Sequence, residues 1–321
     1  MYLHQPFLLN NKKLQTRFQT LFLVIPVIGI LALVFFSVSL SPNTTKPLAI
    51  SGSRIAVFVD HSASLEIDDL DETVQRQFTT LSGTEVPNFG FNRANVWLKF
   101  TLDPKQLREE NYILEIRNPV LDVVDIYEYH TTEYRQIGET GDLLPFSTRE
   151  IEHRNFRIPI WLSGTDEKTF FIKVNSGGEQ LYAPLQLWTP QQLEDADLKD
   201  HLLLGTYFGI IVFVLLFNLF IYLILKEKSN LYYVQYNLNL LLLQLGLTGY
   251  AFQFVWPNSP YLANITNPFF ASTAVFYLLK FSQYFLELKT TFPKVDKIFS
   301  TVGWIILGNA LLCIFNIQPL S

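Results

Sequence analysis

The sequence has one cysteine and one methionine among its 321 residues, and only 17% of the residues are charged. The single Cys313 excludes an internal disulfide framework and a cysteine-rich zinc site. Soluble proteins carry about a quarter of charged residues, so this chain is too apolar for an ordinary soluble protein. Hydrophobic residues make up 49% instead, and phenylalanine alone fills 28 positions.

The sequence also lacks the motifs of catalysis and metal binding. It contains no G-x-S-x-G elbow, P-loop or dinucleotide fingerprint. The acidic stretch 60–72 lacks the Asp-x-Asp-x-Asp-Gly spacing of a calcium loop. None of the histidines has the spacing of a metal ligand; they are His4, His61, His130, His153 and His201. We therefore predict no catalytic residue, no metal and no cofactor in this chain, and interpret it as a protein that is not an enzyme.

Charge is divided between two parts of the chain. Residues 41–202 carry 26 acidic and 15 basic residues, whereas the remainder carries 3 acidic and 9 basic residues. The acidic middle excludes a nucleic-acid binder that works by neutralising phosphates, and the other basic residues are too scattered for that role. The pattern predicts a membrane protein with one soluble domain of roughly 160 residues, large enough to bury its own core.

The first apolar run covers residues 21–40 and contains no charge. Twenty residues at a helical rise of about 1.5 Å each span the hydrocarbon core of a bilayer, about 30 Å thick. Basic residues precede the run, so the positive-inside rule predicts a cytoplasmic tail at 1–20 and sends the chain outside from residue 41. The run is a signal anchor or a signal peptide: its length favours retention, and Ser37 with Ser39 provides the small-residue spacing of a cleavage site.

Four further apolar runs predict four spans after the soluble domain, at about 202–225, 231–254, 263–286 and 299–317. The loops between them are basic, uncharged and basic in turn. That order agrees with a soluble domain at 41–200 outside the membrane and with alternating loops inside and outside. Amide side chains in the first two of these spans are expected to hydrogen-bond between helices.

The soluble domain has the period-two alternation of half-buried strands. In 96–102 one face carries Val, Leu, Phe and Leu, and the other carries Trp, Lys and Thr. Seven such runs separated by turn signals predict an antiparallel β-sandwich. A single helix is predicted at about 70–80, preceded by acidic residues that suit its N-terminal end. The strand runs are 55–59, 96–102, 112–116, 123–129, 156–160, 170–174 and 185–188.

Motifs in both halves resemble one family. The soluble part carries Gly90-Phe91, VWLKFTL at 96–102, TGDLLPF at 140–146, HRNF at 153–156 and LWTP at 187–190. The apolar part carries Gly209, FNLF at 217–220, YYV at 232–234, GYAFQ at 249–253 and WPNSP at 256–260. Over about residues 50–318 the chain resembles the bacterial seven-transmembrane receptors with diverse intracellular signalling modules, with a type 2 extracellular domain.

The resemblance implies a periplasmic sensor domain with a jelly-roll-like fold, similar to carbohydrate-binding modules. It also implies a helical module in the bacterial inner membrane that relays the signal to a cytoplasmic diguanylate cyclase or histidine kinase. This chain departs from the family pattern, because it has four spans after the sensor rather than seven and no output domain. We therefore predict a receptor truncated at its C-terminal side, since three more spans would return the chain to the cytoplasm; the alternative is a complete short protein.

Five residues are candidates for ligand binding. If Trp97 and Trp188 face away from the apolar side of their strands, their rings offer stacking platforms for a sugar; the alternative is that they belong to the core. Arg154 and Asn155, with Asp142 upstream, provide a guanidinium and an amide that could fork a carboxylate or a hydroxyl pair on a ligand. The alternative for these polar residues is a structural salt bridge or a loop hydrogen bond.

We interpret the chain as a sensor that binds a small ligand, with carbohydrate as one candidate class, and that acts through the lipid bilayer. A homodimer or a separate cytoplasmic signalling protein would complete the output. The alternative is an envelope accessory protein that binds a protein or glycan and sends no signal. A transporter is the weakest reading, because no charged residue lies in the middle of a span.

Overall fold

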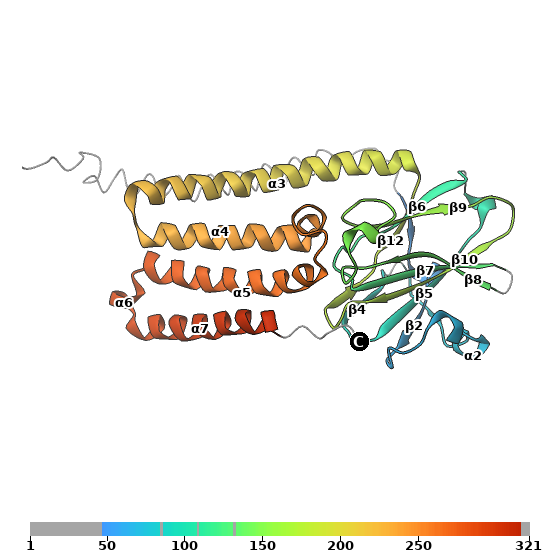
Figure 1. Ribbon diagram of the computed structural model, residues 1–321, viewed down its shortest axis with the longest axis horizontal. Helices are drawn as coiled ribbons and strands as arrows, with labels where there is room; N and C mark the ends of the chain where they lie inside the picture. The colour runs from blue at the N-terminus through green and yellow to red at the C-terminus, as the bar shows by residue number, and fades with distance from the viewer. Residues whose placement is uncertain (1–46, 84–85, 108, 131–132, 316–321) are drawn as a thin grey trace, which may run out of the picture.

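The computed structural model describes residues 47–315, apart from 84–85, 108 and 131–132. A β-rich domain comes first, and a row of helices follows it end to end (Figure 1). The predicted tail at 1–20 and the predicted anchor or signal peptide at 21–40 lie outside the described residues. The last two residues of the predicted fourth span lie outside them as well.

The β-rich domain is the sandwich that the alternation predicted. One sheet has the strand order β1-β12-β6-β9, and the other has the order β3-β2-β5-β10-β7-β8. A small third sheet pairs β11 with β4, and all pairings are antiparallel. The strands are β1 (Leu48–Ile50), β2 (Ala56–Asp60), β3 (Thr79–Thr80), β4 (Asn88–Phe91), β5 (Asn95–Leu102), β6 (Asn111–Ile116), β7 (Val123–His130), β8 (Glu133–Thr140), β9 (Phe156–Trp161), β10 (Lys168–Asn175), β11 (Gln180–Tyr182) and β12 (Leu185–Trp188).

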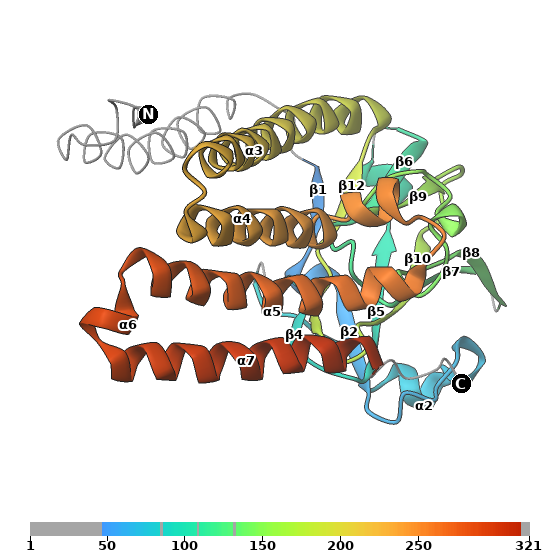
Figure 2. The same cartoon turned by 60° about the vertical axis from the view of Figure 1, so that its left-hand side comes forward.

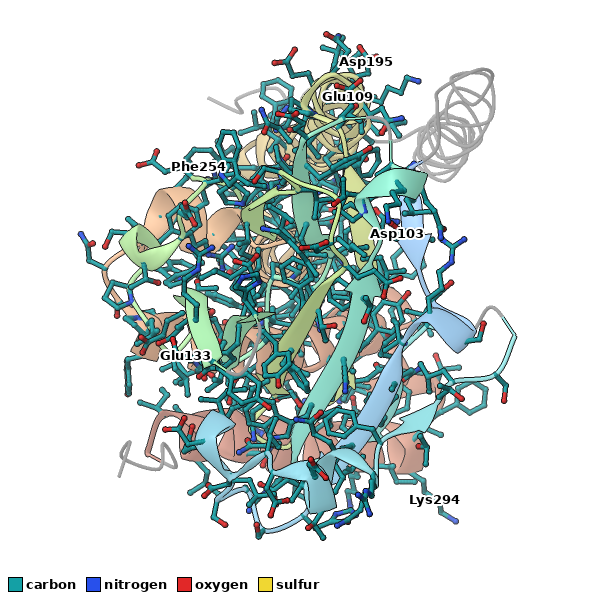
Figure 3. All side chains as sticks on the ribbon, turned by 90° about the vertical axis from the view of Figure 1, so that its right-hand side faces the viewer. Asp103, Glu109, Glu133, Asp195, Phe254 and Lys294 are labelled. Carbon is teal, nitrogen blue, oxygen red and sulfur yellow. The ribbon has the colours of Figure 1, made fainter. Side chains whose placement is uncertain are left out.

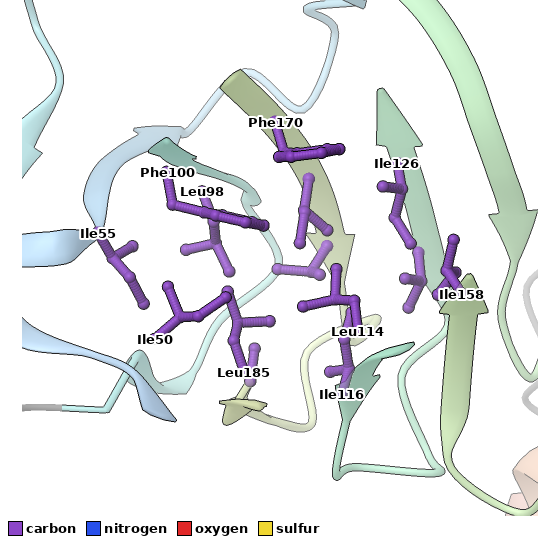
Figure 4. Packing of buried hydrophobic residues seen from close by; sticks show 14 of the residues in the cluster. Ile50, Ile55, Leu98, Phe100, Leu114, Ile116, Ile126, Ile158, Phe170 and Leu185 are labelled. Carbon is purple, nitrogen blue, oxygen red and sulfur yellow. The ribbon is translucent and has the colours of Figure 1, made fainter. Parts of the chain in front are cut away.

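The main core lies between the two large sheets (Figure 4). Alternate residues of β5, such as Leu98 and Phe100, point into it and meet Leu114 and Leu185 from the facing sheet. Phe100 stacks on Phe170 with the ring centroids 5.3 Å apart. Burying these side chains is the main source of stability for the domain, at about 1.5–3 kcal/mol for each large apolar group.

A second, smaller core covers the outer face of the six-stranded sheet. The chain between β2 and β3 folds over this face and brings Leu70 and Phe78 onto Phe171 of β10. The predicted helix at 70–80 is wrong in extent: α2 covers only Glu72–Gln75. Asp71 caps it by accepting from two backbone N–H groups, and the chain must then extend so that β3 can pair with β2. The short 3-10 helices are η1 (Gly52–Arg54), η2 (Ile67–Asp69), η3 (Pro104–Gln106) and η4 (Phe146–Thr148).

Four long helices lie side by side in one row, in the order α3, α4, α5 and α7 (Figures 1 and 2). Among the described residues, three helices are long and apolar enough to cross a membrane: α3, α5 and residues Pro293–Leu312 of α7. α4 lies between α3 and α5 and is less apolar because of its amide side chains. The helices are α3 (Pro190–Leu225), α4 (Lys228–Leu247), α5 (Pro260–Phe285), α6 (Leu288–Thr291) and α7 (Pro293–Phe315).

The first of these helices begins twelve residues before the predicted span. Thr189 caps it through a capping box with Gln192, and Pro190 occupies the first turn. The helix then runs without a break for 36 residues, or roughly 54 Å. A hydrocarbon core is about 30 Å thick, so α3 is too long to lie wholly in lipid. Its first turns, at residues 190–199, pack against the sandwich instead, and we call them the outer turns of α3. One continuous helix therefore runs across residue 200, where the soluble domain was predicted to end.

The second span is shorter than predicted. α4 ends at Leu247 rather than at 254, because Gly249 adopts a positive φ of 80° and turns the chain out of the helix. Residues Ala251–Val255 form a single π turn, η5. One side of this turn meets the sandwich, and Phe254 projects from the rim of the molecule (Figure 3). Its exposed ring suits the interface between lipid and water.

The amides of the helices mostly bond within their own helix. The side chains of Asn218, Asn237 and Asn239 each donate to the carbonyl four residues earlier. Among the amides of α3 and α4, Asn239 also bonds to a second helix, because Thr273 of α5 donates to its side-chain oxygen at 2.7 Å. In α5, Gln283 Nε2 donates to Asp296 Oδ1 at 2.8 Å and to Ser300 Oγ at 2.9 Å, which joins α5 to α7. The expectation of hydrogen bonds between helices, made for the first two spans, is therefore met at Asn239 among the described residues.

Candidate functional site

Trp97 does not offer a stacking platform. Its ring faces away from the main core, as the alternation predicted, but the second core covers that face and leaves the side chain 0% exposed. The ring packs near Tyr127, with the centroids 6.2 Å apart, and the Lys173 ammonium lies 5.8 Å from its centre. The prediction failed because the period of a strand identifies its two faces but not which of them another segment covers.

Trp188 and Asn155 also belong to the interior, around a buried carboxylate. Trp188 is 5% exposed, and its Nε1 donates to Glu115 Oε2 at 3.1 Å. Asn155 Nδ2 donates to the other oxygen of Glu115 at 3.0 Å. Arg157 of β9 donates to the same oxygen from Nε at 3.0 Å and from Nη2 at 2.8 Å. Glu115 is 2% exposed, so its charge is balanced by bonds within the protein rather than by water.

The same arginine reaches the first turns of α3. Arg157 Nη1 donates to Asp197 Oδ2 at 2.7 Å while its other side holds Glu115, so one guanidinium joins β6, β9 and the helix. Burial opposes ionisation of Asp197, but the hydrogen bonds and charge of Arg157 outweigh it and lower the pKa. Burial, with the nearby charge of Arg157, lowers the pKa of His153 to about 3, so its imidazole is neutral at physiological pH.

Arg154 is fixed between the sandwich and two helices, so it is not free to fork a ligand in this conformation. Its Nη2 donates to Asp200 of α3 at 3.0 Å, and its Nη1 donates to the Thr248 carbonyl at the end of α4 at 3.4 Å. The guanidinium also lies 5.4 Å from the centre of the Tyr250 ring. Arg117 Nη2 donates to the same oxygen of Asp200 at 2.6 Å. The structure therefore gives Arg154 the salt bridge that was its alternative reading.

Asp142 lies at a second contact, where the sandwich meets the turn before α5. The Asn264 amide of α5 donates to Asp142 at 3.5 Å. Close by, the backbone N–H of Phe146 donates to the Pro257 carbonyl at 2.9 Å, and the Phe146 ring meets Phe252 edge to face at 5.7 Å. A cavity of about 10 Å³, enough for one water, lies between these surfaces and is lined in part by Asp142.

Arg149 fills the space beneath this contact. Its guanidinium lies 4.7 Å from the centre of the Phe146 ring, 4.3 Å from that of Phe156 and 5.5 Å from that of Phe252. Burial lowers its pKa to about 10 despite the nearby Asp142. The cation thus ties the loop after β8 to the π turn by cation–π contacts, which gain strength where water is excluded.

The five candidates therefore divide into two groups. Four of them, Asp142, Arg154, Asn155 and Trp188, lie at or just beneath the contact of the sandwich with the helices. Trp97 lies apart from it, under the second core. We call the contact surface the junction; it is formed by the first turns of α3, by residues 248–257 and by the loops that carry Asp142 and Arg154. In the described ranges, no group of three or more His, Cys, Asp or Glu side chains is placed to hold a metal ion.

The carboxyls of Asp122 and Asp142 predict a pH-dependent junction. The two side chains are hydrogen-bonded; burial raises the pKa of Asp122 to about 6, and burial with the charge of Asp122 raises the pKa of Asp142 well above its usual value. Glu179, Arg149 and Asn264 also face this pair. Because the folded state holds protons that the unfolded state releases, this contribution to stability is present below about pH 4 and is lost as pH rises through about 6.

Asp142→Asn mimics the protonated acid, so we expect the variant and the unchanged protein to melt together at pH 4 and to separate as pH rises. The variant should melt at the higher temperature as pH rises, because it removes a buried carboxyl whose pKa is raised well above its usual value. Each pKa unit of that shift amounts to about 1.4 kcal/mol, or about 4 °C in melting temperature at pH 7. Melting curves of the full chain in nanodiscs from pH 4 to 8 measure this. His153 gives both proteins a pH dependence of the opposite sign, which cancels when one melting temperature is subtracted from the other. A difference in melting temperature that does not change with pH would contradict the prediction.

Two models of known protein families match this chain, one in each half. The family model for the 7TMR-DISM extracellular 2 domain matches residues 52–189. The model for the 7TM diverse intracellular signalling module matches residues 200–321. The chain belongs to the 7TMR-DISM family. A comparison with curated proteins gives no match.

Membership of the 7TMR-DISM family makes the chain part of a transmembrane sensory receptor, with domains that are sensory and not catalytic. Residues 190–199, the outer turns of α3, lie between the two matched regions. The junction thus lies where the sensor of a 7TMR-DISM protein passes into its membrane module.

Sequence reasoning missed the centre of the junction. Glu115 and Arg157 each stand in a strand whose neighbours are apolar, Leu114 and Ile116 in one case and Phe156 and Ile158 in the other. Opposite charges inside two apolar strands are a signal for a buried pair, because an unpaired charge there would cost several kcal/mol. Their partner Asp197 gave no such signal, since it lies in a run of exposed acids.

Proposed function

We propose that this chain is the sensing and membrane-embedded part of a bacterial receptor, with the sandwich in the periplasm and the helices in the inner membrane. The observation that carries the proposal is that the sandwich holds three helices at once. Arg157 binds α3, Arg154 reaches the end of α4, and Asp142 meets α5. A ligand that favours one orientation of the sandwich therefore favours one packing of the helices.

The proposed ligand is a small molecule of the carbohydrate class, which the family resemblance supports. Of the three tryptophans in the described part of the sandwich, Trp161 is the one with a solvent-exposed ring, at 63%. It ends β9, at the opposite end of the strand from Phe156 beside the junction. Lys168 donates to its carbonyl at 2.9 Å and pairs with Glu128 at 2.7 Å. A sugar ring can stack on an exposed aromatic ring, and its hydroxyls can hydrogen-bond to charged groups beside that ring. This combination is typical of a sugar-binding site.

Melting of the full chain in nanodiscs, with and without a panel of mono- and oligosaccharides, tests the sensor function. We expect at least one sugar to raise the melting temperature, and Trp161→Ala to weaken its binding about tenfold through loss of about 1.4 kcal/mol of stacking. Trp161→Phe is the matched control and should keep part of the affinity. If no small molecule shifts the melting temperature and the chain instead captures a protein or a polymeric glycan, the accessory function replaces the sensor.

The signal would leave through a cytoplasmic output module, a diguanylate cyclase or a histidine kinase in the family pattern, carried by the receptor polypeptide or by a partner protein. Two chains acting as a homodimer would bring two such modules together. Fusing each kind of module to the inner end of the helices and assaying its product with and without the sugar tests this step; no response from either fusion would count against it.

A further inference from the structure

One long side of α3 has no protein partner among the described residues. The helix packs on α4 at the edge of the row, and no other described helix lies on its opposite side (Figure 2). Only 6% of the most apolar 18-residue stretch of α3 is buried in the protein, against 33% of the corresponding stretch of α5. The open side follows the helix at steps of three or four residues and consists of Leu202, Gly205, Gly209, Phe213, Leu216 and Phe220.

The outer half of this side is shaped for close approach. Gly205 and Gly209 form a G-x-x-x-G pair, and apart from their own helix no atom of the described residues lies within 4 Å of the position where a Cβ would stand on either of them. A pair of glycines one turn apart leaves a shallow slot in which the backbones of two helices can meet, whereas helix faces that meet only lipid gain nothing from such a slot. The slot thus fits an apolar helix.

The course of the chain shows which helix is within reach. β1 pairs with β12 so that Leu48 stands opposite Leu187, two residues before the cap of α3. From Pro190 to Leu202 the helix descends about 18 Å. Residues 41–47 can extend over at most about 25 Å. The uncharged run at 21–40 therefore ends within reach of the level at which the open side of α3 begins.

We propose that the open side of α3 is the docking surface for this chain's own segment 21–40, which is retained as a membrane anchor. The run crosses from inside to outside and α3 crosses from outside to inside, so the two would lie antiparallel. Their lengths agree, since the run covers about 30 Å and Leu202–Leu225 covers about 35 Å. With Leu40 level with Leu202, Gly209 stands near Leu33.

Disulfide cross-linking of the full chain in native membranes tests the proposal. In a Cys313→Ser background, Gly209→Cys is combined in turn with Leu31→Cys, Ala32→Cys, Leu33→Cys, Val34→Cys and Phe35→Cys, which together cover more than one helical turn. The same five substitutions at residues 31–35 are combined with Ile305→Cys as the matched control. Ile305 is exposed on α7, at the far edge of the row.

We expect at least one pair with Gly209→Cys to cross-link within a single chain, at least tenfold more than any pair with Ile305→Cys. A mature protein whose N-terminus, read by mass spectrometry, lies beyond residue 40 would overturn the proposal. So would a covalent dimer formed by Gly209→Cys alone, which would assign the slot to a second copy. Failure of all five pairs to cross-link would leave the surface to lipid and reject the docking.

Discussion

Arg157→Ala is expected to lower the melting temperature of the sandwich by about 10–15 °C. The substitution leaves Glu115, which is buried, without its main cation and frees Asp197 from its only bidentate partner. Removing one member of a buried pair costs about 3–5 kcal/mol, because the remaining charge is stranded away from water. Each kcal/mol shifts the melting of a domain of this size by about 3 °C.

Two variants separate the charge from the geometry in that measurement. Arg157→Lys keeps the positive charge but cannot hold two carboxylates with one planar fork, so we expect about half of the loss. Arg76→Ala removes an arginine whose ion pair with Glu72 leaves both side chains exposed, and should change the melting temperature by about 1–2 °C at most. Equal effects of Arg157→Ala and Arg76→Ala would show that the buried pair does not stabilise the junction.

Gly249→Ala is expected to open the junction without unfolding the sandwich. At a φ of 80° a side chain is strained, and the new Cβ would stand 2.7 Å from the Pro119 side chain and 3.2 Å from the Arg154 backbone. The strain of about 1–2 kcal/mol and the clash together amount to about 2–4 kcal/mol. Hydrogen exchange of the Phe146 amide, which bonds across the junction to Pro257, should then accelerate about 30- to 1,000-fold.

Gly308→Ala in α7 is the matched control, since its backbone is helical and, apart from that helix, no described atom lies within 4 Å of its Cβ position. It should leave exchange at Phe146 unchanged. If Gly249→Ala accelerates exchange throughout the sandwich core as well, the glycine supports the whole fold rather than the junction. If Gly249→Ala leaves hydrogen exchange unchanged everywhere, Pro119 can move aside to accept the new Cβ, and the junction does not depend on this glycine.

Much of the fold could be predicted from local patterns, because hydrophobic period and span length are local properties. All seven predicted strands are present, and β5 shows why: Val96, Leu98 and Phe100 alternate with larger or polar residues over its whole length. The short strands β1, β4 and β11 have three or four residues each, too few for a period to be read. β8 was missed because its sequence, EYRQIGET, is mostly polar and half of its residues are exposed.

The candidate site could be predicted only in part, because it depends on how two domains meet. HRNF at 153–156 and Asp142 drew attention as polar residues near strands, and they do line the junction. Their partners Asp197, Asp200 and Thr248 lie 44–94 residues away along the chain, and the first two belong to a helix that was divided between two predicted elements. Nothing local in Gly249 distinguishes it from the other glycines until its neighbours Pro119 and Arg154 are placed beside it.

The uninterrupted α3 has a consequence for building chimeric receptors. A swap at residue 190 would place a foreign sandwich on this protein's turn at 248–257, and a swap at residue 202 would still separate Arg154 from Thr248. The smallest unit that can be transplanted intact is therefore not contiguous in sequence: it comprises the sandwich, the outer turns of α3 and the turn between α4 and α5. Exchanging only the first two is expected to give receptors that fold but respond weakly to their ligand.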